Sequence, residues 1–393
     1  MSLDSPAFVP PPYPHDRLGP IRATAAAVPG GILDASVGTP VDPMPALVLD
    51  ALAAAAPAGT GYPATIGSAG FREAAVGWVA RRFGCSLTVD DVIACIGTKE
   101  VVASLPRMLS LRDPSRDTVL YPAVAYPTYE MGALLAGLRA VPVPVDDEWH
   151  LDLDRVDPRD AERALVLWLN DPSNPTGAVA TPQGMLDAVE WARARGILVA
   201  SDECYAEFTY DADGAPAAPV TALAATDGGA DGVLAVHSLS KRSNMAGLRA
   251  GFIAGDRDLV TYLGEMRKHG GLMMPSPIQA AAAAALGDDE HVREQQARYA
   301  RRRALALPAL ESRGLVHDGG SSTFYLWLRD ADADRARDGW AIAEDLATTG
   351  LVVAPGDFYG TASTDHVRVA LTLTDDQIDL LCERAAPSQG CVT

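Results

Sequence analysis

The chain has 393 residues, 48% of them hydrophobic and 21% charged, which is enough for a large domain and a smaller one and excludes a disordered protein. Its 51 acidic residues outnumber 32 basic ones, and the net charge of -19 argues against a protein that binds the phosphate backbone of nucleic acid. Only three of the basic residues are lysines, Lys99, Lys241 and Lys268, so any chemistry of a side-chain amine depends on one of them.

The cysteines show no pattern of a metal site, and the first twenty residues show no targeting signal. Five cysteines lack the spacing of a zinc site or a disulfide framework, which favours reduced thiols in a cytoplasmic protein. The first twenty residues lack the basic start and apolar core of a signal peptide, and no apolar stretch is long enough to span a bilayer. We therefore expect a cytoplasmic protein with no membrane partner. The prolines of residues 1–20 predict an extended N-terminal arm.

From about residue 90, short apolar runs alternate with helix-length segments. The runs occupy 92–96, 118–121, 165–169, 197–200, 233–236 and 251–254, and the predicted helices include 99–111, 127–138 and 181–195. This alternation is typical of βα units around a buried, mostly parallel sheet, so we predict an α/β fold. In such a sheet the functional loops follow the carboxyl ends of the strands.

The C-terminal third predicts a different organisation. Residues 275–313 are expected to be almost wholly helical, as a long amphipathic connector. Predicted strands at 322–330, 351–356 and 366–373 and predicted helices at 340–350 and 375–386 then form a smaller α+β unit. We assign residues 21–60 and 275–393 to this small domain and residues 61–274 to the large one.

Polar and aromatic residues follow the first three apolar runs. Gly97, Thr98 and Lys99 open a predicted helix whose free N–H groups can bind an anion, although most turns of this kind bind only water. Tyr126 offers a ring for stacking on a flat ligand, or it packs within its loop. Asn174 lies in a turn rich in proline and glycine, which would hold its amide rigidly.

Charged residues and hydroxyls follow the next two runs. Asp202 stands directly after a predicted strand, where it could cap a helix or hold a carboxylate opposite a cation in a dry site. Lys241 follows the next run, close to Ser238 and Ser240, with Arg249 eight residues beyond. Two hydroxyls and a guanidinium are suited to a dianion, which a lone surface lysine would not require.

Four motifs occur in a fixed order within this region: Asn-Pro-Thr-Gly at 174–177, Ser-Asp-Glu-Cys-Tyr at 201–205, Ser-x-Ser-Lys at 238–241 and Gly-x-Arg-x-Gly-Phe at 247–252. Together they resemble the class I/II aminotransferases of fold type I, which use pyridoxal 5'-phosphate (PLP). The resemblance covers nearly the whole chain. It is strongest to the actinobacterial-type N-succinyldiaminopimelate aminotransferases, through segments 36–43, 61–63, 96–100, 125–130, 236–244 and 354–360.

This resemblance implies a seven-stranded, mostly parallel sheet between helices, a smaller α+β domain, and a homodimer. It implies that Lys241 carries PLP as an aldimine, that Asp202 pairs with the pyridinium nitrogen, and that Tyr205 and Asn174 hydrogen-bond the O3' oxygen. Tyr126 would stack on the ring. The phosphate contacts that it implies are Thr98, Lys99, Ser238, Ser240, Arg249 and, from the other subunit, Tyr62. Arg368 would hold the substrate α-carboxylate close to the backbone of Gly38.

The implied reaction transfers an amino group from glutamate or an amino acid like N-succinyl-LL-diaminopimelate to a 2-oxo acid. Two departures from the family pattern leave the substrate open: residues 320–324, where the substrate side chain could be read, and Leu248 in place of a tyrosine. One alternative is a PLP enzyme of specialised metabolism that eliminates or replaces a β or γ group or forms a C–C bond. A PLP-sensing regulator is disfavoured, because only the proline-rich arm precedes the fold and the net charge is -19.

Overall fold

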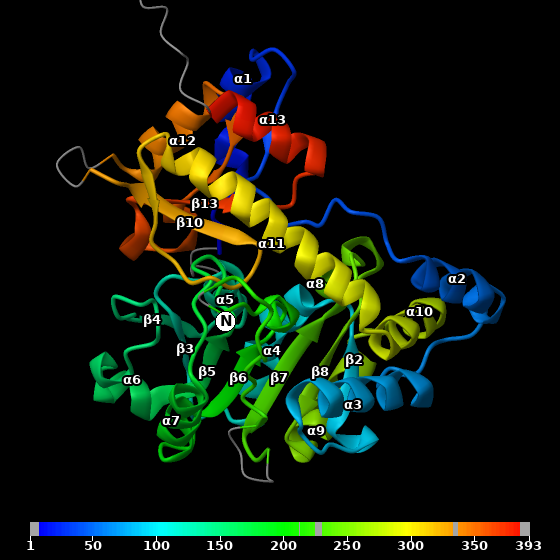
Figure 1. Ribbon diagram of the computed structural model, residues 1–393. Coiled ribbons are helices and arrows are strands. Elements are labelled where there is room, and N and C mark those ends of the chain that lie inside the picture. Colours follow the sequence, from blue (N-terminus) through cyan, green and yellow to red (C-terminus); the bar gives the residue numbers. More distant parts are fainter. Residues whose placement is uncertain (1–7, 212, 225–229, 333–336, 386–393) are drawn as a thin grey trace, which may run out of the picture.

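A seven-stranded sheet forms the centre of the computed structural model, which describes residues 8–211, 213–224, 230–332 and 337–385 (Figure 1). In spatial order its strands are β2 (Val92–Cys95), β8 (Gly251–Gly255), β7 (Val233–Ser238), β6 (Leu198–Asp202), β5 (Ala164–Asn170), β3 (Thr118–Pro122) and β4 (Arg139–Val143). Strand β8 runs antiparallel to β2 and β7, and the other neighbouring pairs are parallel. The predicted α/β fold with a mostly parallel sheet is confirmed.

Six of the strands coincide with the six apolar runs, and β4 is the strand that no run predicts. It lies at the edge of the sheet, and its residues from Arg139 to Pro142 are exposed or half-buried. Its sequence is Arg-Ala-Val-Pro-Val, and Pro142, a residue that sheets tolerate at an edge, interrupts the β-branched residues. The proline and the edge position together explain why no apolar run predicts β4.

Helices cover both faces of this sheet, because successive residues of a strand point to opposite sides. In β5, Val166 belongs to a buried cluster with Leu105 of α4 (Thr98–Arg112), and Leu167 belongs to the opposite cluster with Val189 of α7 (Pro182–Arg193). The large unit also contains the helices α3 (Ala69–Phe83), α5 (Thr128–Leu135), α6 (Pro158–Arg163), α8 (Leu239–Arg242) and α9 (Arg257–His269).

The smaller unit contains a four-stranded antiparallel sheet in the order β12-β13-β10-β9. Its elements are α1 (Gly19–Ala26), β1 (Leu33–Asp34), β9 (Leu315–His317), β10 (Tyr325–Asp330), α12 (Gly339–Ala347), β11 (Leu351–Val352), β12 (Ala354–Pro355), β13 (His366–Ala370) and α13 (Asp375–Ala385). The strand expected at 351–356 is divided at Val353, because β11 pairs with β1 while β12 pairs with β13.

The predicted helical connector is two helices, α10 (Ser276–Gly287) and the long α11 (Glu290–Glu311), which runs from the large unit to the small one (Figure 1). Helix α10 and α2 (Ala46–Ala55) fall within the predicted small domain, yet they lie side by side, and α10 also packs against α3 of the large unit. Val48 and Ala281 are buried there, in a core that covers one face of the large sheet. The boundaries after residues 20, 60 and 274 stay a prediction.

Residues 8–13 of the N-terminal arm form neither helix nor strand, and the part before Phe8 lies outside the described residues. A 3₁₀ turn, Pro14–Leu18, then leads into α1, and Leu18 is buried in the core of the small unit. Over the residues that the structure covers, no helix combines the length and the apolar character needed to cross a membrane.

Candidate active site

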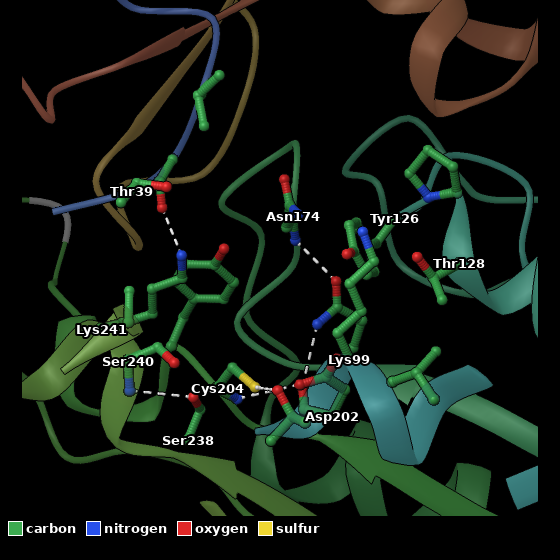
Figure 2. A pocket seen from close by; sticks show the side chains of 18 of the residues that line it. Thr39, Lys99, Tyr126, Thr128, Asn174, Asp202, Cys204, Ser238, Ser240 and Lys241 are labelled. Atoms are coloured by element: carbon green, nitrogen blue, oxygen red, sulfur yellow. Dashed lines mark hydrogen bonds between the residues drawn. The ribbon is translucent and has the colours of Figure 1, made fainter. Parts of the chain in front are cut away.

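A cavity of about 480 Å³ opens where the large sheet meets the small unit (Figure 2). The last residues of three parallel strands, Asn170, Asp202 and Ser238, line it from the large unit, and Tyr325 and Arg368 line it from the small one. All the predicted site residues except Tyr62 line this cavity: Gly38, Thr98, Lys99, Tyr126, Asn174, Asp202, Tyr205, Ser238, Ser240, Lys241, Arg249 and Arg368.

Lys241 reaches the cavity from α8, which starts directly after β7. Ser238 caps this short helix, because its Oγ accepts a hydrogen bond of 3.1 Å from the backbone N–H of Ser240. The Lys241 ammonium donates to the carbonyl oxygen of Gly38. Burial lowers the pKa of Lys241 from 10.5 to about 8, and the positive charges of Arg368 and Arg249 act in the same direction. The amine therefore releases its proton more readily than an ordinary lysine does.

Asp202 ends β6 with its carboxylate buried and held from two sides. The hydroxyl of Tyr129 donates to Oδ2 over 2.9 Å, and the backbone N–H of Cys204 donates to Oδ1 over 3.2 Å. Burial raises the pKa of Asp202, and these hydrogen bonds oppose that rise because they favour the ionised form. Figure 2 shows Asp202 and Cys204 beside Ser238, Ser240 and Lys241.

Arg368 extends from β13 as a buried cation with a defined direction. Its Nη1 donates to the Asn174 side-chain oxygen and its Nη2 to the carbonyl of Ser36, each over 2.8 Å. The guanidinium lies 4.1 Å from the ring centroid of Tyr325 and 4.9 Å from that of Tyr359. Its Nε is buried without a hydrogen-bond partner among the described residues. A planar cation in this position can grip a carboxylate.

The amino end of α4 is open to the same cavity. Gly97 stands at its N-cap with a φ of 72° and supplies no side-chain cap. A Cβ at Gly97 would lie 2.3 Å from Nη2 of Arg249, so the glycine lets the guanidinium approach the helix end. Together with the hydroxyls of Thr98, Ser238 and Ser240, this cationic cradle suits a phosphate dianion.

Lys99 and Tyr62, two of the predicted phosphate contacts, are placed differently from the other predicted site residues. The ammonium of Lys99 lies 5.1 Å from the ring centroid of Tyr13 and 5.9 Å from that of Tyr126, between the arm and the large unit. Tyr62 is 99% exposed and does not line the cavity of its own chain. Its contact with a phosphate of the other subunit stays a prediction.

The sequence missed several residues that line the cavity, namely Tyr13, His15, Thr39, Cys204, Tyr325, Phe358 and Tyr359. Most of them come from the arm and the small unit, where no strand-end pattern indicated a site. Residues 320–324, where the substrate side chain could be read, do not line this cavity, and their part in substrate recognition stays a prediction. Ser321 donates to the carbonyl of Tyr210, Ser322 accepts from the N–H of Tyr210, and both line a separate hollow beside Gly177.

Comparisons with known proteins agree with this geometry. The family model for aminotransferase class I and II matches residues 32–384. A Mycobacterium tuberculosis protein named a probable aminotransferase is 47% identical over 371 residues, which are 94% of this chain and 83% of that protein. The Streptomyces rimosus enzyme OxyQ, 4-dedimethylamino-4-oxo-anhydrotetracycline transaminase, is 44% identical over 370 residues, covering 94% of this chain and 97% of OxyQ.

Among solved structures, a probable N-succinyldiaminopimelate aminotransferase from Thermus thermophilus has a TM-score of 0.83 and 29% sequence identity, over 94% of this chain and 98% of that one. The cavity has the features that PLP requires, since it combines a lysine of lowered pKa, a buried carboxylate and a phosphate-sized cationic cradle. The chain belongs to the class I and II aminotransferases and is a PLP-dependent aminotransferase.

Proposed function

We propose that Lys241 is the residue to which PLP is joined, with Asp202 facing the ring nitrogen and Tyr205 and Asn174 facing the O3' oxygen. The observation that carries this proposal is that one cavity gathers a lysine whose pKa is about 8, a buried carboxylate and an uncapped helix start. When bound, PLP supplies an electron sink for the pair left at the substrate Cα. An ionised Asp202 would keep the ring nitrogen protonated, and Tyr126 would cover the ring.

The phosphate would lie at the amino end of α4. Arg249, Ser238, Ser240 and Thr98 offer a guanidinium and three hydroxyls there, and the backbone of Thr98 and Lys99 adds N–H groups. Because these donors come from two separate segments, the start of α4 after β2 and the connection between β7 and β8, they would fix both the position and the tilt of the ring. The free amine of Lys241 would then move the proton of the substrate Cα.

The amino donor that this site suits best is an acidic amino acid, such as glutamate or N-succinyl-LL-diaminopimelate. Arg368 would hold the α-carboxylate, and its guanidinium direction is set by Asn174 and Ser36. Lys99 lines the same cavity and forms no ion pair with an acidic residue in the described part of the chain, so its charge remains available for a distal carboxylate.

A second candidate differs in the acceptor and not in the reaction. Aromatic side chains line much of the cavity, among them Tyr13, Tyr126, Phe358 and Tyr359. OxyQ, whose name describes a transaminase of a tetracycline intermediate, is 44% identical to this chain. These two observations favour a bulky ketone of specialised metabolism as the acceptor, with the amino group still supplied by an amino acid.

The experiment follows the visible absorbance of the PLP-loaded protein while single amino donors are added. We expect glutamate to convert the visible band into the band of the aminated cofactor, and a 2-oxo acid or a bulky ketone to restore it. Lys241→Ala should abolish the initial band. A persistent band in Lys241→Ala, or no conversion with any acidic donor, would contradict the proposed lysine or the proposed donor class, respectively.

We also propose that the enzyme works as a homodimer in which Tyr62 of each chain reaches the phosphate of the other. Tyr62 is 99% exposed, and Val41, Leu49 and Ile66 are further exposed apolar residues. Sedimentation at decreasing concentration, combined with PLP titration of Tyr62→Phe, tests this assembly. A monomer that binds PLP and turns over at high dilution would refute it.

A further inference from the structure

Tyr325, the first residue of β10, lies where several residues of the proposed site meet. Its hydroxyl is 2.8 Å from the hydroxyl of Tyr205, and its ring lies 4.1 Å from the Arg368 guanidinium. The hydroxyl also fills the space beside Gly38, where a Cβ would lie 1.9 Å from the Tyr325 oxygen. The carbonyl of Gly38 in turn accepts a hydrogen bond from Lys241. One side chain of the small unit therefore contacts three proposed site residues, and one of them, Gly38, is hydrogen-bonded to Lys241.

The hydrogen bond between the two phenols has a defined direction if Tyr205 binds the cofactor, an assumption that rests on the proposed function. Tyr205 has one proton, which it would donate to the phenolic oxygen of PLP, so its oxygen can only accept from Tyr325. The side chains are well shielded, since Tyr205 is 6% exposed and Tyr325 is 2% exposed. Water therefore competes little for this bond, and the two tyrosines form a short chain of hydrogen bonds.

In such a chain, a donor on the Tyr205 oxygen polarises the Tyr205 O–H group and strengthens the bond that this group donates. The phenolic oxygen of PLP would accept this bond from Tyr205. The same oxygen would also accept a hydrogen bond from the protonated nitrogen that joins Lys241 to PLP, so the two donors would compete for it. A stronger bond from Tyr205 therefore makes that nitrogen easier to deprotonate. We propose that Tyr325 is a positioning residue which, acting through Tyr205, favours the unprotonated form of this nitrogen.

A spectroscopic pH titration of the PLP-loaded protein without substrate tests this role. Tyr325→Phe keeps the ring beneath Arg368 and removes only the hydroxyl. We expect the midpoint of the visible absorbance change to rise by roughly half a pH unit, because one supporting hydrogen bond of the chain is lost. The KM for the amino donor should change less than about twofold, because the ring contact with Arg368 remains.

A double-mutant cycle decides whether the effect passes through Tyr205. In a Tyr205→Phe background, Tyr325→Phe should cause no further shift, because the group that transmits its effect is absent. Tyr299→Phe is the matched control. Tyr299 is a buried phenol of the same core whose oxygen has no hydrogen-bond partner among the described residues, so its midpoint should equal that of the parent protein.

A midpoint for Tyr325→Phe equal to the parental one overturns the inference, and so does a shift that adds fully to that of Tyr205→Phe. If Tyr325→Phe fails to fold, 3-fluorotyrosine at position 325 replaces it. This more acidic phenol donates more strongly, so it should lower the midpoint, and an unchanged midpoint overturns the inference. A visible band that persists in Lys241→Ala refutes the proposed site and this inference together, whereas a normal parental band with no Tyr325 effect refutes only the latter.

Discussion

Gly97→Ala should weaken PLP binding as well as the fold. Gly97 has a φ of 72° and a ψ of 150°, a backbone region essentially confined to glycine, where a residue with a Cβ is strained by about 1–3 kcal/mol. The added Cβ would also lie 2.3 Å from Nη2 and 2.6 Å from Cζ of Arg249, so the guanidinium must move away from the end of α4. A hydrogen bond between charged partners contributes about 1.5–3 kcal/mol, so its loss corresponds to roughly 10- to 150-fold weaker PLP binding.

The assay titrates the PLP-free protein with PLP and follows absorbance, with chemical denaturation as the measure of stability. Gly84→Ala is the matched control, because Gly84 has a φ of 70° and, within the described residues, a Cβ there would have no heavy atom within 4 Å. Both variants should lose stability, Gly97→Ala more than Gly84→Ala, and only Gly97→Ala should lose affinity for PLP. Equal PLP affinity in the two variants would refute the assignment of the phosphate to this helix end.

Three further substitutions test buried charges. Tyr129→Phe removes a hydrogen bond that opposes the burial-induced rise in the pKa of Asp202. The acid limb of the pH profile of kcat/KM should therefore move up by roughly one pH unit. In the control Tyr262→Phe, which loses only a hydrogen bond to the Met108 carbonyl, the acid limb should stay in place. Burial raises the pKa of Asp171 from 3.8 to about 7, so folding favours the protonated carboxyl and the stability of the fold decreases as the pH rises between these values. In chemical denaturation, Asp171→Asn should therefore stabilise the protein by roughly 2–4 kcal/mol at pH 8 and by much less at pH 4. Arg302→Met should destabilise by about 3 kcal/mol in the same assay, because Asp42 loses hydrogen bonds of 2.7 and 2.8 Å from a buried guanidinium, and an unchanged transition would contradict this.

The large unit could be predicted from the sequence because its site residues follow its strands in chain order. Asn174, Asp202 and Lys241 each stand just after an apolar run, and a parallel sheet brings such positions to one edge. The same rule missed β4, an edge strand whose apolar run is interrupted by Pro142. The rule also did not predict the hydrogen bond from Tyr129 to Asp202. Tyr129 is 73 residues away in the chain, and the bond depends on the packing of α5 against the sheet.

The small-unit side of the cavity could not be predicted in this way. Tyr325 and Arg368 are adjacent through the antiparallel pairing of β10 with β13, and they meet Gly38 and Ser36, which are more than 280 residues away in the chain. Arg368 was named only through the family resemblance, and Tyr325, which lies in a predicted strand, was not named as a site residue. Contacts between segments so far apart depend on how the two units pack, which no local pattern of residues encodes.

The electrostatics of the cavity reverse those of the whole chain. A protein of net charge -19 places Lys99, Lys241, Arg249 and Arg368 around one cavity, with Asp202 as the buried carboxylate among them. Burial is the larger cause of the low pKa of Lys241, and the two arginines add to it. A phosphate beside Arg249 and a carboxylate beside Arg368 would each neutralise part of this field. The two anionic groups of the ligand would therefore be coupled to the protonation of Lys241, because the arginines proposed to bind them also lower its pKa.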